Sequence, residues 1–128
     1  VWKNSSVQLW KLCRNNAIEY FHFLQPNQYF PGTRALTAWE QENAFLDEEY
    51  TYRQGAEAGY PLLVAGGSEL AAMDVSFRDL TGVFRDVNET VYRDSCCHYN
   101  EAGNAILARS IAESMKESSR GNNPDAVY

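Results

Sequence analysis

The chain has 128 residues, of which 45% are hydrophobic and 22% charged, and this size predicts one compact domain. Eleven Lys and Arg against seventeen Asp and Glu give a net charge of −6, so the chain is not expected to bind DNA or RNA. Its apolar runs fall short of the roughly 20 residues that a membrane span needs, so no membrane span is expected. The compartment stays open, with a secreted or periplasmic location among the options.

A helix, a strand and a long loop are expected first. Apolar residues recur at three- and four-residue steps over residues 2–16, which predicts an amphipathic helix. The aromatic and branched residues of 17–24 then predict a buried strand that ends in a Gln-Pro-Asn turn. The loop 25–36 follows the carboxyl end of this strand, where α/β proteins place their sites. It is therefore a site candidate by position.

The middle of the chain predicts helices covering a sheet. Thr37 opens a capping-box pattern, which favours a charged helix through about Arg53, with a second helical stretch around residues 59–61. Ser68 is expected to cap a short helix through Met73. A short strand over residues 75–77 follows, so the α/β alternation continues.

One further helix is expected to close the domain. Apolar residues predict a broad apolar face over residues 100–116. Residues 118–128 are polar and are interpreted as a flexible tail, which leaves residues 1–117 as the folded unit.

Two histidines restrict where acid–base chemistry could lie. His22 falls inside the aromatic strand and is interpreted as a buried, hydrogen-bonded structural residue. His98 lies in a polar loop with Asp94 four residues upstream. A carboxylate that orients an imidazole base is the arrangement that nucleophilic catalysis uses, so His98 and Asp94 are the candidate catalytic residues. The structural alternative is that Asp94 anchors the loop and His98 caps the helix.

The stretch Asp-Ser-Cys-Cys-His-Tyr-Asn-Glu-Ala-Gly-Asn, which begins at Asp94, resembles the last conserved block of the SGNH/GDSL hydrolases. Residues 21–29 and 77–81 are similar to upstream segments of that family. The resemblance implies a flavodoxin-like three-layer α/β/α sandwich, of which this chain would be the C-terminal half. It also implies an esterase or acyl hydrolase in which His98 is the base and Asp94 the acid of a Ser-His-Asp catalytic triad. In the family the Asp usually stands three residues before the His, and here it stands four before.

The nucleophilic Ser of the family lies in an earlier Gly-Asp-Ser block that this sequence lacks. Ser68, in Gly-Gly-Ser-Glu-Leu, is superficially similar, but its place in the chain order differs, so a helix cap is the preferred interpretation. Cys97 beside His98 is disfavoured as a nucleophile because neighbouring residues of an extended segment point to opposite faces. A zinc site from Cys13, Cys96, Cys97 and His98 lacks paired Cys-x-x-Cys spacing. At most one internal disulfide can form among the three cysteines.

The sequence leaves two functions open for this chain. The first is the C-terminal portion of an SGNH/GDSL-type esterase, acting on a small ester, with an N-terminal segment or companion chain that completes the fold and supplies the Ser. In that case, residues 25–32, with Tyr29 and Phe30, are expected to line the substrate pocket. No cofactor or metal is expected. The alternative is a non-catalytic α/β binding or scaffold domain.

Overall fold

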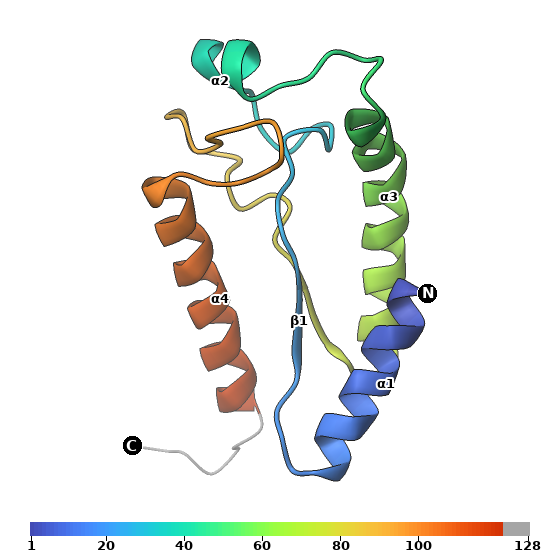
Figure 1. Cartoon of the computed structure of the whole chain (residues 1–128). Coiled ribbons are helices and arrows are strands. Elements are labelled where there is room, and N and C mark those ends of the chain that lie inside the picture. The colour runs from blue at the N-terminus through green and yellow to red at the C-terminus, as the bar shows by residue number, and fades with distance from the viewer. Residues whose placement is uncertain (122–128) are drawn as a thin grey trace.

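A computed structural model of the chain describes residues 1–121. Within this range the elements run in the order α1 (Trp2–Asn15), β1 (Phe21–Leu24), α2 (Ala38–Asn43), α3 (Thr51–Ala71), β2 (Ser76–Asp79) and α4 (Glu101–Gly121). Figure 1 shows α1 and α3 on one side of β1 and α4 on the other side. The last residues of the expected tail, 122–128, lie outside the described part.

The sheet consists of the two strands β1 and β2, which pair in parallel with Phe21 opposite Ser76 and Leu24 opposite Asp79. Parallel pairing needs a crossover, and α2 and α3 lie in it. The described chain is therefore a small α/β protein, as expected, but two strands are too few to define the three-layer sandwich that the resemblance implies.

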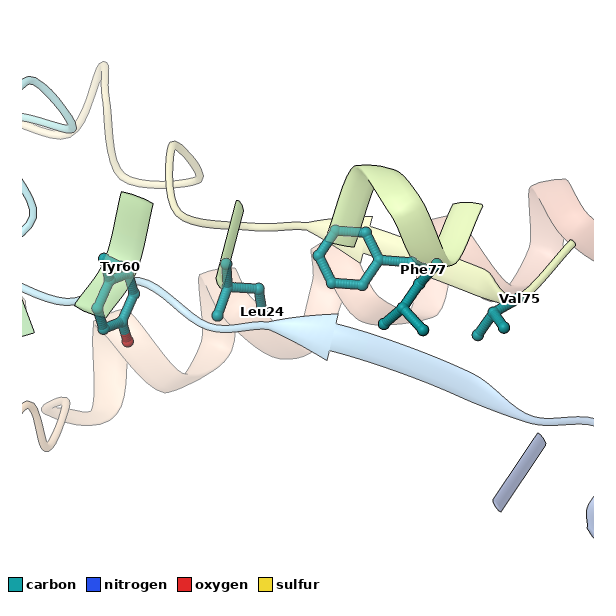
Figure 2. Close-up of a cluster of buried hydrophobic side chains, with 5 residues drawn as sticks. Leu24, Tyr60, Val75 and Phe77 are labelled. Carbon is teal, nitrogen blue, oxygen red and sulfur yellow. The ribbon is translucent and has the colours of Figure 1, made fainter. Parts of the chain in front are cut away.

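The main core lies between the sheet and the helices α1 and α3. Its buried members are Leu24, Tyr60, Leu70, Val75 and Phe77. Figure 2 shows Leu24 of β1 and Phe77 of β2 in this cluster together with Tyr60 of α3. A Cβ atom built on Gly67 of α3 would lie 2.1 Å from the Phe77 ring. The helix can approach β2 this closely only because residue 67 has no side chain.

A second core lies under the loops at the carboxyl ends of the strands. It contains Ala44, Phe84, Val91, Tyr92 and Tyr99, and Ile106 and Leu107 of α4 pack against it. The expected apolar face of α4 is only partly covered, since Ile106 and Leu107 are half-buried whereas Met115 is 41% exposed. The first turns of α4 are thus attached to the loops that carry the candidate site.

Several expected boundaries differ from the structure. The helix opened by Thr37 ends at Asn43, and the two separate helices expected near residues 59–61 and at Ser68 are one continuous helix, α3. Pro61 lies inside this helix. The buried residues Tyr60, Gly67 and Leu70 of the helix hold it against the sheet. Tertiary packing therefore overrides the local breaking signals.

The other boundaries shift less. The first strand is limited to its last four residues, the second begins and ends later than expected, and the last helix continues past residue 116 to Gly121. Residues 118–121 are therefore helical, so the expectation of a frayed tail from residue 118 was wrong for them. The first helix has the expected bounds to within one residue.

Candidate functional site

The two candidate catalytic residues lie in a short hairpin-like loop between β2 and α4. Tyr92 and Tyr99 form an antiparallel bridge at its base, and the Arg93 amide donates to the His98 carbonyl oxygen at 3.0 Å. Cys97 has a left-handed backbone with φ of 58°. This tight turn brings the fourth residue after Asp94 back toward it, without any helix.

The Asp94 carboxylate binds the loop and the imidazole together. Its Oδ2 lies 2.8 Å from Nδ1 of His98, and its Oδ1 accepts hydrogen bonds from the Cys96 amide at 2.9 Å and the His98 amide at 3.4 Å. Partial burial acts to raise the pKa of Asp94, but the hydrogen bonds from the Cys96 amide and from His98 outweigh it and hold this pKa below its usual value. The prediction that Asp94 and His98 share one loop is confirmed.

The imidazole of His98 is oriented and reachable at once. A carboxylate only accepts hydrogen bonds, so the neutral ring carries its proton on Nδ1 and leaves Nε2 as the acceptor. The side chain of His98 is 70% exposed, so the ring is reachable from solvent. The pair is arranged to take a proton at Nε2 while Asp94 stabilises the resulting imidazolium.

The loop after β1 forms the support beneath this pair. Nε2 of Gln28 donates to the Asp94 carbonyl oxygen at 3.0 Å, and the Tyr29 hydroxyl donates to the Ser95 carbonyl oxygen at 2.9 Å. The Tyr99 hydroxyl donates to the Pro26 carbonyl oxygen at 2.6 Å. The loop after β1, which was a site candidate by its position in the chain, therefore supports the loop that carries His98.

The expected role of Tyr29 and Phe30 was wrong. Tyr29 is only 2% exposed and is held between the Ser95 carbonyl and the Leu46 amide, so its ring is part of the interior. Phe30 packs against Tyr60 at a ring distance of 5.4 Å and belongs to the main core. Gln25 and Asn27 of the same loop, which were not singled out, do line a cavity.

Glu40 fixes the base of the hairpin. Its fully buried carboxylate accepts hydrogen bonds from the backbone amides of Val91 at 2.8 Å and Tyr92 at 2.9 Å, and it forms an ion pair with Arg34 at 3.0 Å. The same carboxylate completes the capping box with Thr37. The capping box was predicted, but the long-range contacts of Glu40 carry no local sequence signal.

Asn100 and Gly103 attach α4 to the same hairpin. The side-chain oxygen of Asn100 accepts from the Gly103 amide at 2.9 Å, and its amide group donates to the Thr90 carbonyl at 2.6 Å. A Cβ on Gly103 would lie 3.0 Å from that of Tyr99 and 3.1 Å from that of Val91. Asn100, and not His98, caps the helix.

Two hollows near His98 share part of their walls. One, of about 620 Å³, is polar and includes Arg93, Asp94, His98 and Asn104 in its lining. The other, of about 460 Å³, lies along α3, and Gln25 and Cys97 line both hollows. A further hollow of about 520 Å³ lies around residues 17–21 and Asp74, at the amino ends of the strands, away from this pair.

The remaining candidates are not brought to His98. Ser68 lies inside α3, so its expected role as a helix cap was wrong; its hydroxyl donates to the Val64 carbonyl at 3.3 Å. Tyr52, whose hydroxyl donates to Cys97 Sγ at 3.2 Å, is sixteen residues from Ser68 on the same helix, about 24 Å along its axis. Ser68 is therefore at the wrong end of α3 to serve His98.

His22 is hydrogen-bonded within the structure as expected, but it is half-buried and not fully buried. Its Nδ1 lies 2.6 Å from the hydroxyl of Ser6, which is 2% exposed, and its ring packs edge-on against Trp2. Burial lowers the pKa of His22. The histidine thereby fixes α1 against β1.

The three cysteines are free thiols, and Cys13 lies on α1 whereas the other two lie in the His98 loop. Cys97 Sγ contacts Tyr52 and the Gln25 amide, which lies 3.7 Å away. Among residues 1–121, no group of three or more His, Cys, Asp and Glu side chains is arranged to hold a metal ion. None of the helices that the structure describes is long and apolar enough to cross a membrane.

Comparisons with protein-family models, with curated proteins and with solved structures returned no match to the chain.

Proposed function

We propose that the chain is the C-terminal portion of an SGNH/GDSL-type esterase or acyl hydrolase, and that His98 and Asp94 are the base and the orienting acid of its Ser-His-Asp triad. The observation that carries this proposal is the contact of 2.8 Å between Asp94 Oδ2 and Nδ1 of an exposed histidine. The resemblance of the block that begins at Asp94 adds to it.

In this proposal, Nε2 of His98 takes the proton from a serine hydroxyl as its oxygen attacks the ester carbonyl carbon. The imidazolium then protonates the alcohol oxygen as the ester bond breaks, which leaves an acyl-serine. Water hydrolyses the acyl-serine in the second half of the cycle, again with Nε2 as base. Asp94 keeps the proton of the neutral ring on Nδ1 throughout.

The serine and the donors that bind the oxyanion would come from an N-terminal segment or a companion chain. The two-stranded sheet supports this, because each strand has one edge that pairs with nothing among the described residues. Exposed apolar side chains on α1, such as Leu9 at 50% and Leu12 at 62%, add apolar surface that a further segment could cover.

A fluorophosphonate probe, which labels only activated serines, tests this proposal. A protein that joins this chain to its N-terminal segment should be labelled at a serine outside residues 1–128, and His98→Ala should abolish the labelling. The chain alone should stay unlabelled and should hydrolyse short nitrophenyl esters no faster than free imidazole does. Ser68→Ala is the matched control, and loss of labelling or turnover in this variant would contradict the proposal. Labelling that survives His98→Ala would contradict the role of His98 as the base, and absence of labelling in the joined wild-type protein would favour the binding or scaffold function.

A further inference from the structure

The cavity of about 460 Å³ along α3 is lined by side chains that carry no formal charge. Its walls include Gly55, Ala56, Gly59 and Leu63, which repeat at three- and four-residue steps and so share one face of the helix. Tyr52 and Tyr60 complete the same wall. A cavity of this size and apolar character suits a small organic group and disfavours an ion.

Two glycines give the cavity its depth. A Cβ atom on Gly55 or on Gly59 would meet no atom within 4 Å, so neither residue is required by packing. The contrast is Gly67 on the same helix, where a Cβ would collide with Phe77. Glycine inside a helix costs about 0.5–1 kcal/mol relative to alanine. Packing among the described residues gives no reason for this cost at positions 55 and 59. A ligand in the cavity would explain it, because a side chain at either position would take up the space of the ligand.

The cavity shares two wall residues with the polar hollow of the His98 pair. Gln25 and Cys97 belong to its wall and also to the wall of the polar hollow that contains His98 and Asp94. The Tyr52 hydroxyl, which donates to Cys97 Sγ, lies at the same junction. An occupant of the cavity that contacts Cys97 would therefore lie beside the residue that precedes His98 in the chain.

We infer that this cavity binds the acyl chain of the ester, with the carbonyl end near Cys97 and the hydrocarbon running along α3 past Gly55 and Gly59 toward Leu63. Gly55 and Leu63 are eight residues apart, about 12 Å along the helix axis, which sets the length of chain that fits. The inference rests on the proposed function for the chemistry at His98, but the binding itself needs neither the histidine nor a serine.

The test is binding of straight-chain methyl esters, from butanoate to decanoate, to the 128-residue chain, followed by NMR shifts of the backbone amides. Affinity should rise about fourfold with each added methylene until the cavity is full, and the shifts should centre on Gly55, Gly59 and Leu63. Affinity that does not change with chain length, or shifts centred elsewhere, would overturn the inference.

Gly59→Leu fills the cavity and should end the rise at a shorter ester. The change favours helix, so the variant is expected to fold. Ala58→Leu is the matched control, because Ala58 is exposed on the same helix outside the cavity wall, and it should leave the series unchanged. An unaltered series in Gly59→Leu would contradict the inference.

His98→Ala separates the two proposals. This variant should bind the esters as the wild type does, because His98 is not in the cavity wall. If the series holds while the longer protein keeps its activity without His98, the proposed function fails and the cavity assignment stands. If the activity of the protein with the N-terminal segment depends on His98, but the affinity for the methyl esters does not change with chain length, the cavity assignment alone fails.

Discussion

The buried carboxylate of Glu40 accepts a hydrogen bond of 2.9 Å from the backbone amide of Tyr92, a residue 52 positions later in the chain. Tyr92 is also one half of the bridge that closes the hairpin carrying Asp94 and His98. Arg34, whose side chain is 1% exposed, neutralises the carboxylate. The orientation of the candidate catalytic loop thus depends on a charge buried in α2.

Glu40→Gln should destabilise the protein by about 3–5 kcal/mol, because it leaves the Arg34 guanidinium buried without its counter-charge. Urea denaturation of the two proteins measures the difference. Glu42→Gln, an exposed change in the same helix, is the control and should stay within about 0.5 kcal/mol of wild type. Equal stability of the Glu40 and Glu42 variants would show that the buried pair is not required.

Glu40 also predicts sensitivity to acid. Burial acts to raise the pKa of Glu40, but hydrogen bonds from the amides of Tyr92, Thr37 and Val91, with the Arg34 charge, lower it below the unfolded value of 4.5. The stability that the ionised group contributes is therefore complete above pH 4.5 and is lost as the pH falls through the folded pKa. As the pH is lowered below 4.5, the urea concentration at the unfolding midpoint should decrease for wild type, and it should decrease less for Glu40→Gln. An equal decrease of the urea midpoint in the two proteins would contradict the assignment of this acid sensitivity to Glu40.

Gly67→Ala should destabilise the protein by about 1–3 kcal/mol, because the added methyl group collides with the Phe77 ring in the core. Gly59→Ala on the same helix meets open space and should stabilise the protein by up to about 1 kcal/mol. Thermal melting of both variants is the measurement. Stabilisation by both changes would show that helix propensity, and not packing against β2, decides the outcome.

His22 predicts a second dependence on pH. Because burial lowers the pKa of His22 below 6.5, the unfolded chain binds the proton more readily than the folded one. The contribution of the neutral imidazole is complete above pH 6.5 and declines as the pH falls toward the folded pKa. The stability difference between wild type and His22→Gln, from urea melts at pH 7.5 and 5.5, should shift against wild type at the lower pH. A shift in favour of wild type would contradict the burial of the neutral ring.

The sequence was most informative where local patterns determine structure. The apolar stripe of α1 and the capping box of Thr37 and Glu40 depend on neighbours within a few residues, and both are found. The spacing of Asp94 and His98 was sufficient to predict that they share one loop, although the pair meets through the left-handed turn at Cys97 and not on a helical turn.

Residues that act over long distances could not be predicted in this way. Nothing near Tyr29 in the sequence shows that its hydroxyl supports Ser95, 66 residues later. The continuity of α3 through Pro61 likewise depends on contacts with the sheet and with α1. Trp2, which precedes α3 in the sequence, and Phe77, which follows α3, both pack against this helix. Such pairings depend on the assembled core, which a reading of local patterns does not include.

The central claim, that His98 is the base of an acyl hydrolase, is tested most directly by the kinetics of His98→Ala in a protein that joins this chain to the proposed N-terminal segment. A general base acts in the transition state, so kcat should fall by about 10³-fold or more while KM changes by less than about twofold. Asp94→Asn should lower kcat by a smaller factor, since its contact with the ring is partly exposed and water can replace it. Wild-type kcat in His98→Ala would contradict the claim.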